Sequence, residues 1–198
     1  MGSLVKFHLD QLMDRFNART LVETGTGLGK SLRYARGFPF EAIYSVEIVA
    51  EQVEKLRVEF AGDPRIQLIA GESTAVLRDL IPKLTGNTIF WLDAHFPGAH
   101  LGLAGYEPDG NREIQLPLQR ELEMLRDMRP GFRDVILIDD LRIYERDAFQ
   151  KGNASDAVPG YQWPDDSRFL YTTFAATHVW HRFLDDEGYF ALLPKDGA

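Results

Sequence analysis

Acidic side chains follow several apolar stretches that have the length of buried strands. Glu23, Glu47, Asp93 and the pair Asp139-Asp140 occupy such positions, and His95 comes two residues after Asp93. In an open parallel sheet, ligands bind outside the carboxyl ends of the strands. Charged groups at the end of a buried strand are costly unless they are paired or bound to something, and oxygen ligands suit Mg²⁺, Ca²⁺ or Mn²⁺. These side chains could therefore hold a cation, bind hydroxyl groups or move a proton.

A glycine-rich turn accompanies the first of these acids. Residues 21–31, LVETGTGLGKS, predict a short apolar strand, a turn and the start of a helix. The glycines let the backbone approach a ligand closely, and the helix start offers unpaired N–H groups. We expect a nucleotide-like ligand to lie across this turn.

Three nucleotide-binding fingerprints compete for this stretch. Gly29-Lys30-Ser31 ends a phosphate loop, but the first glycine of that loop falls on Thr24. Gly25 and Gly27 begin a dinucleotide loop, but its third glycine falls on Lys30. The pattern acidic-x-G-x-G-x-G fits without exception from Glu23 to Gly29.

That pattern resembles the first motif of class I S-adenosylmethionine-dependent methyltransferases, which are Rossmann-like proteins. The resemblance implies that the turn passes under the methionine part of the cofactor, that Glu23 lies near its amino group, and that Glu47 binds its ribose. It also implies that the turn after the third strand borders the adenine, although Ser73 there is equally expected as a helix N-cap. The implied cofactor-binding residues are Glu23, Gly25, Thr26, Gly27, Gly29, Glu47, Gly71, Glu72 and Ser73.

The remaining acids resemble those of metal-dependent O-methyltransferases, including the sugar methyltransferases of macrolide and aminocoumarin pathways. The resemblance implies that Asp93, Asp139 and Asp140 are metal ligands for a divalent cation such as Mg²⁺. Where the sugar enzymes follow the first Asp with Gly-Asp, this chain has Ala94-His95. We therefore assign catalytic roles to Asp93 and His95, with His95 either a ligand or the general base.

Three further segments resemble a bacterial methyltransferase-like group. They are residues 90–95 (FWLDAH), a helix with Pro117-Leu118 and Glu121-Leu122, and residues 135–140 (VILIDD). We expect Glu121 to be a solvated helix residue. The fourth strand lacks the Pro-Pro-aromatic sequence that accompanies N-methylation, which favours transfer to oxygen.

Composition narrows the functions further. The 198-residue chain is 44% hydrophobic and carries a net charge of −8, which disfavours nucleic acid and favours a small-molecule acceptor. The absence of cysteine excludes disulfides, thiolate zinc sites and a cysteine nucleophile. No signal core or membrane-length apolar run is present, so we expect a cytoplasmic protein without membrane contact. A homodimer is compatible with this length.

The elements predict a single α/β domain over residues 1–198. A covering helix is expected within 1–18, and alternating strands and helices lead to a doubly wound, mostly parallel sheet with helices on both faces and a C-terminal antiparallel hairpin. The expected strands are 20–23, 42–47, 65–70, 88–93 and 134–139, the hairpin is 178–184 with 189–194, and an early helix spans 28–36. Residues 94–113 and 146–168 are expected as active-site loops, in which the aromatic candidates for an acceptor pocket are Tyr106, Tyr161 and Trp163, with Phe169 next to them.

The leading hypothesis is methyl transfer from S-adenosylmethionine to an oxygen of a small polyhydroxylated acceptor, such as a sugar, assisted by a divalent cation. One alternative is a P-loop NTPase in which Gly29-Lys30-Ser31 holds phosphate and Asp139 or Asp93 holds Mg²⁺. Another is a module that binds the cofactor without turnover. Preferential binding of ATP with Mg²⁺ over S-adenosylhomocysteine would favour the NTPase.

Overall fold

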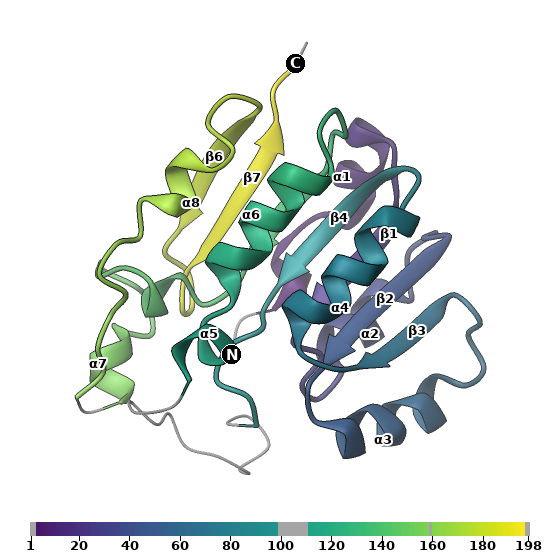
Figure 1. Cartoon of the computed structure of the whole chain (residues 1–198), viewed down its shortest axis with the longest axis horizontal. Helices are drawn as coiled ribbons and strands as arrows, with labels where there is room; N and C mark the ends of the chain where they lie inside the picture. The colour runs from purple at the N-terminus through teal and green to yellow at the C-terminus, as the bar shows by residue number, and fades with distance from the viewer. Residues whose placement is uncertain (1–2, 99–110, 159, 197–198) are drawn as a thin grey trace.

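A computed structural model of the chain describes residues 3–98, 111–158 and 160–196. In this part of the chain one seven-stranded sheet has the order β3-β2-β1-β4-β5-β7-β6 (Figure 1). The strands are β1 (Ala18–Thr24), β2 (Ala42–Glu47), β3 (Ile66–Ala70), β4 (Asn87–Leu92), β5 (Val135–Ile138), β6 (His178–Phe183) and β7 (Tyr189–Pro194). The first five strands pair in parallel, whereas β7 pairs antiparallel with both β5 and β6. The predicted doubly wound sheet with a terminal hairpin is confirmed.

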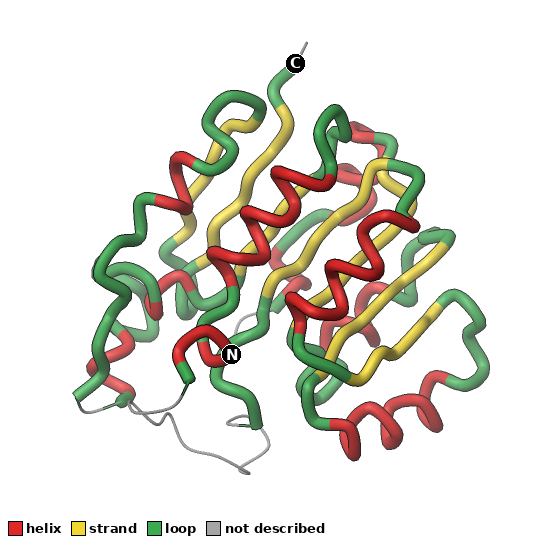
Figure 2. The backbone as a smooth tube through the Cα atoms, in the orientation of Figure 1, coloured by secondary structure: helices red, strands yellow, loops and turns green. Residues whose placement is uncertain are grey.

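Helices cover both faces of the sheet, as Figures 1 and 2 show. They are α1 (Leu9–Phe16), α2 (Lys30–Ala35), α3 (Ala50–Phe60), α4 (Ser73–Leu80), α5 (Arg112–Gln115), α6 (Leu118–Met128), α7 (Ala154–Ala157) and α8 (Phe169–Thr172), with 3₁₀ turns at Leu4–Lys6, Ile81–Lys83 and Leu141–Ile143. The amphipathic helices bury one apolar stripe each and leave the other side to solvent.

Successive residues of each central strand point to opposite faces, which produces two apolar cores. Val22, Phe90 and Ile136 join α4 and α6 in one core. Leu21 and Trp91 join α1, α2 and α3 in the other. Because both faces are covered, the strands are continuously apolar rather than alternating.

The predicted elements differ from the observed ones mainly at their ends. The first strand is longer than predicted and runs from Ala18 to Thr24, whereas the helix expected over 28–36 spans only Lys30–Ala35. This helix begins late because Gly29, with φ of 74°, has left-handed backbone geometry. The expected loops contain α5 and α7. None of the described helices is long and apolar enough to cross a membrane.

Candidate functional site

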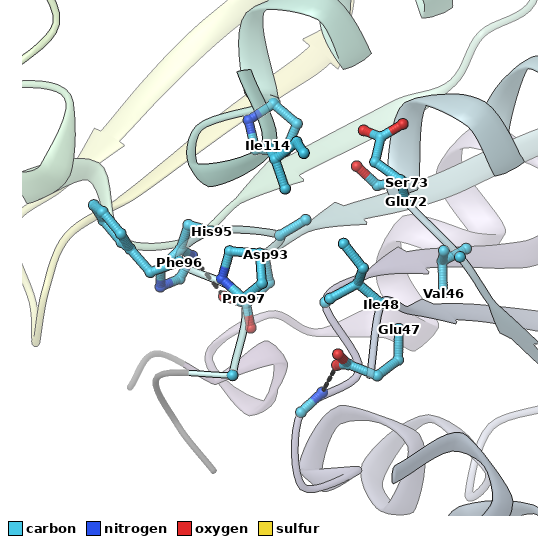
Figure 3. A pocket seen from close by; sticks show the side chains of 16 residues that line it. Val46, Glu47, Ile48, Glu72, Ser73, Asp93, His95, Phe96, Pro97 and Ile114 are labelled. Carbon is cyan, nitrogen blue, oxygen red and sulfur yellow. Dashed lines mark hydrogen bonds and ion pairs between the residues drawn. The ribbon is translucent and has the colours of Figure 1, made fainter. Parts of the chain in front are cut away.

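A pocket opens at the carboxyl ends of β1, β2, β3 and β4, where the strand order reverses between β1 and β4 (Figure 3). It encloses about 570 Å³ of empty space, including space at its open mouth. It is lined by Gly25, Gly27, Val46, Glu47, Ile48, Gly71, Glu72, Ser73, Asp93, Ala94, His95, Phe96, Pro97, Gly98, Ile114 and Pro117. This is the place where an open parallel sheet binds nucleotide-like ligands.

The glycine turn after β1 brings the backbone close to the end of β4. Gly25 has φ of +81°, and a Cβ atom there would collide with the backbone carbonyl of Asp93. The N–H groups of Gly25 and Thr26 both donate to the carbonyl of Val46, at 2.9 and 3.2 Å. Gly25 is therefore required both by its left-handed conformation and by a contact that excludes any side chain.

Glu47 ties this turn to the end of β2. Its Oε2 accepts a hydrogen bond from the N–H of Gly27 at 2.9 Å (Figure 3). Its Oε1 accepts one from the N–H of Val49 at 3.0 Å. Each carboxylate oxygen has a further lone pair that can accept from a hydroxyl. This geometry leaves Glu47 able to accept from two hydroxyls, and its binding of a ribose stays a prediction.

Glu23 lies beneath the turn rather than in the pocket wall. It is 1% exposed, and Ser45 donates a short hydrogen bond to its Oε2. Burial raises the pKa of Glu23 to about 8, although the hydroxyls of Ser45 and Ser31 lower it. Thr26 also lies under the turn, with its hydroxyl 2.6 Å from that of Ser45. Both residues support the turn from below.

Gly29 packs against α3, whereas the residues predicted to border the adenine line the pocket. A Cβ on Gly29 would come within 2.9 Å of the Leu56 side chain, so this glycine lets α3 pack against the turn. Gly71, Glu72 and Ser73 do line the pocket. The N-cap of α4 is Glu72, not Ser73 as the sequence suggested, because the Glu72 carboxylate accepts from the N–H groups of Thr74 and Ala75. The first residue of the helix is Ser73.

His95 lies between two carboxylates at the other end of the pocket. Its Nε2 is 2.9 Å from Oδ2 of Asp140, and its Nδ1 is 3.5 Å from Oδ1 of Asp93. Burial alone would lower the pKa of His95, but the charge and hydrogen bond of Asp140 raise it above its ordinary value. Conversely, burial would raise the pKa of Asp140, but His95 holds it below its ordinary value. The pair is a buried imidazole oriented by a carboxylate.

Asp93 and Asp139 form an acidic pair, because they follow the neighbouring strands β4 and β5. Burial and the charges of Asp139 and Asp140 raise the pKa of Asp93 well above its ordinary range. Burial also raises the pKa of Asp139 to about 8, with a further contribution from Asp140. A proton shared between the carboxyls of Asp93 and Asp139 would relieve their repulsion.

The arrangement of these acids can be compared with the divalent-cation site that the resemblance implies. Buried carboxyl oxygens of Asp93, Asp139 and Asp140 lack hydrogen-bond partners among the described residues, which is the donor chemistry a hard cation prefers. However, the His95 ring already lies between Asp93 and Asp140, and no group of three acidic or histidine side chains in residues 3–98, 111–158 and 160–196 is arranged to hold a metal ion. The acids as arranged do not fit such a site, so the structure gives the predicted cation no support.

Glu121 is where the sequence prediction was wrong. It is 0% exposed on the inner face of α6, not solvated. Burial raises its pKa to about 7, while the hydroxyls of Ser73 and Thr24 beside it lower the pKa. The signal was present in the sequence, since Leu118, Leu122 and Leu125 put position 121 on the apolar side of the helix.

The aromatic candidates lie near the His95 end. Phe96 contacts Tyr161, which in turn contacts Trp163, with ring centroids 6.0 and 5.2 Å apart. Phe169 packs against Tyr144 farther from the pocket, and Tyr106 lies outside the described residues. The structure thus brings a glycine turn, Glu47 and a buried histidine to the lining of one pocket.

Comparison with known proteins supports the same fold. No family model and no curated protein sequence matches the chain. Solved structures do match: a caffeoyl-CoA O-methyltransferase-like protein from Staphylococcus aureus aligns with 94% of this chain and 81% of its own length, at 10% identity and a TM-score of 0.56. The S-adenosylhomocysteine-bound methyltransferase PaMTH1 of Podospora anserina aligns with 95% of this chain and 76% of its own length, at 14% identity and a TM-score of 0.56. The Escherichia coli protein yhhF aligns over 96% and 84%, at 12% identity and a TM-score of 0.53. The predicted resemblance is confirmed at the level of the fold, which is that of class I methyltransferases.

Proposed function

We propose that the protein transfers a methyl group from S-adenosylmethionine to an oxygen of a small polyhydroxylated acceptor, such as a sugar. The observation that carries the proposal is that a single pocket joins the glycine turn and Glu47 at one end to His95 at the other. The fold likeness supports methyl transfer, and the neighbours include an rRNA methyltransferase, so the oxygen acceptor is our own inference.

The end of the pocket at the glycine turn and Glu47 would bind and orient S-adenosylmethionine. Gly25 and Gly27 give the backbone room for the methionine part, and Glu47 accepts hydrogen bonds from the ribose hydroxyls. When bound, S-adenosylmethionine supplies a methyl group activated by the positive sulfonium. The protein must then chiefly align the acceptor oxygen with that methyl group, because positioning alone can remove much of the barrier.

His95 would accept the proton of the acceptor hydroxyl. Its pKa is above the ordinary histidine value because of Asp140, so its neutral form is a stronger base, and Asp140 holds the ring at Nε2. The acceptor oxygen forms the new bond to the methyl carbon, the bond from carbon to sulfur breaks with its electron pair going to sulfur, and the proton goes to His95. General base catalysis of this kind contributes about 10² to 10⁴ in rate. No step in this proposal uses the divalent cation, because the acids as arranged do not fit one.

The phosphate-loop alternative has no support from the comparisons, and Glu47 argues against it physically. A phosphate would need the N–H of Gly27, which already donates to the Glu47 carboxylate. A second anion in the same nest would be repelled. Lys30 is exposed and does not line the pocket.

Calorimetry with S-adenosylhomocysteine tests the proposal, with ATP and Mg²⁺ as the comparison ligand. We expect the homocysteine product to bind and ATP not to bind. The variant His95→Gln is expected to retain this binding but to lose about a hundredfold or more in turnover with an acceptor found by screening sugars for S-adenosylhomocysteine release. The same change at exposed His8 serves as the control. Binding of ATP alone would contradict the proposal, and binding without turnover on any acceptor would favour a non-catalytic module.

A further inference from the structure

A second hollow opens on the segments that follow β5, and the proposed reaction does not use it. It encloses about 1030 Å³ of empty space, including space open to solvent, and Tyr144, Glu145, Arg146, Tyr161 and Trp163 are among the residues that line it. We call it the side hollow. Its walls combine aromatic rings with charged groups, and such a mixture suits a ligand that has both apolar faces and polar edges.

A row of aromatic rings connects His95 with the side hollow. The ring centroids of His95 and Phe96 lie 6.1 Å apart, and that of Tyr161 lies 6.0 Å from that of Phe96 (Figure 3). The next ring is Trp163, at 5.2 Å from Tyr161. His95 and Phe96 line the main pocket, whereas the other two rings line the side hollow. An acceptor that lies along this row therefore reaches both His95 and the side hollow.

Hydrogen bonds to the backbone fix the two rings of the side hollow. The Tyr161 hydroxyl donates to the carbonyl of Ile143 at 2.8 Å. The indole N–H of Trp163 donates to the carbonyls of Arg142 at 2.9 Å and Glu145 at 3.2 Å. The wall is thus formed before a ligand arrives, which lowers the cost of ordering side chains on binding.

Arg146 places a positive charge on this wall. Its guanidinium carbon lies 4.0 Å from the centroid of the Trp163 ring, which is within the range of a cation–π contact. The side chain is exposed, and it forms no ion pair with any residue that the structure describes. A stacked guanidinium keeps its planar set of N–H donors for a ligand, and these donors match the paired oxygens of a carboxylate or a phosphate.

The acid beside Arg146 is already paired. Oε2 of Glu145 accepts from the Tyr171 hydroxyl at 2.9 Å and lies 2.9 Å from Nη2 of Arg182. Its Oε1 accepts from the Ser167 hydroxyl at 3.4 Å. Of the two charged side chains that line the side hollow, Arg146 is therefore the one without a partner of opposite charge in the described structure. In a chain of net charge −8, this is a place that favours an anion.

We propose that the methyl acceptor carries an acidic group, a carboxylate or a phosphate, and that Arg146 binds this group in the side hollow. The inference rests on the proposed function and narrows its acceptor from a sugar in general to an acidic sugar. Binding of the acidic group at Arg146 and of the reacting hydroxyl at His95 fixes the acceptor at two points. Trp163 acts as a positioning residue, because it holds the guanidinium of Arg146.

An NMR titration of isotope-labelled protein, in the presence of excess S-adenosylhomocysteine, tests this inference. The reporter is the indole N–H signal of Trp163, assigned by its loss in Trp163→Phe. The probes are D-glucuronate and D-glucose 6-phosphate, with D-glucose as their neutral counterpart. We expect at least one of the acids to shift this signal with a dissociation constant at least about tenfold below that of D-glucose, since hydrogen bonds between charged groups are stronger than neutral ones.

Two arginine variants show whether the preference comes from Arg146. In Arg146→Gln the preference for the acid should fall to about threefold or less, because the amide has no charge. Arg36→Gln is the matched control and should keep the original preference. The Arg36 side chain is also exposed, and its guanidinium lies over another aromatic ring, that of Phe60, at 5.8 Å.

The outcomes separate this inference from the proposed function. A preference for D-glucuronate alone assigns a carboxylate and one for D-glucose 6-phosphate alone assigns a phosphate, and either supports the inference if Arg146→Gln removes it. A signal that responds to none of the three sugars or equally to all three, or a preference that Arg146→Gln keeps, overturns the inference. If calorimetry detects no binding of S-adenosylhomocysteine, the methyltransferase proposal fails, whereas the Trp163 signal still reports whether the side hollow binds an acid.

Discussion

Replacing Glu23 with glutamine tests whether a carboxylic acid is held neutral beneath the glycine turn. Glu23 is 1% exposed, and burial raises its pKa from 4.5 to about 8. A glutamine has nearly the same shape and can still accept the hydrogen bond of Ser45, but it does not ionise. The variant therefore removes the titration and keeps the packing.

The sign and size of the effect follow from this pKa. Below pH 4.5 both the folded and the unfolded chain hold the proton, and between pH 4.5 and 8 only the folded chain holds it. The favourable contribution of Glu23 is therefore fully present below pH 4.5 and is lost as the pH rises to 8. At about 1.4 kcal/mol per pKa unit, the loss is on the order of 5 kcal/mol.

Urea unfolding at several pH values measures this difference. The free energy of unfolding of Glu23→Gln, minus that of the unmodified protein, should rise by several kcal/mol between pH 4.5 and pH 8. Taking the difference cancels the other buried acids, such as Asp93 and Asp139. Glu41→Gln, at an exposed position before β2, is the control and should show no such rise. A difference that stays constant with pH would refute the reasoning that Glu23 is neutral in the folded protein.

Three further perturbations probe the turn, the ribose acid and the acidic pair. Gly25→Ala should weaken S-adenosylhomocysteine binding at least about tenfold and lower the thermal midpoint of unfolding. Left-handed backbone costs about 1–2 kcal/mol for a residue with a Cβ atom, and the new atom would collide with the Asp93 carbonyl. Gly62→Ala, where a Cβ has no neighbour within 4 Å, is the control. Glu47→Gln should weaken S-adenosylhomocysteine binding by about five- to a hundredfold, because an amide cannot accept from the backbone N–H groups of both Gly27 and Val49. An unchanged dissociation constant would be inconsistent with ribose binding by Glu47. Millimolar Mg²⁺ should leave the thermal midpoint unchanged, and a rise that disappears in Asp139→Asn would instead establish a cation site.

The sequence by itself determined the architecture. Continuous apolar runs of strand length, such as 89–92 and 135–138, predicted strands covered on both faces, and the helical stripes between them predicted a doubly wound sheet. The positions of the glycine turn and of Glu47 at the pocket were likewise predictable, because they depend on local backbone geometry and on the place of a residue at a strand end. Such features need no knowledge of which distant residues come into contact.

The tertiary structure alone decided how each carboxyl is used. Glu23 faces the core under the turn, and Glu72 caps its own helix. The leucine pattern of α6 indicated that Glu121 is buried, but only the packing of α6 beside α4 brought the hydroxyls of Ser73 and Thr24 next to it. His95 meets Asp140 because β4 and β5 are neighbours in the sheet. Burial, hydrogen-bond partners and charges from other strands determine whether an acid ionises, binds a ligand or supports the backbone, and these depend on contacts between residues far apart in the chain.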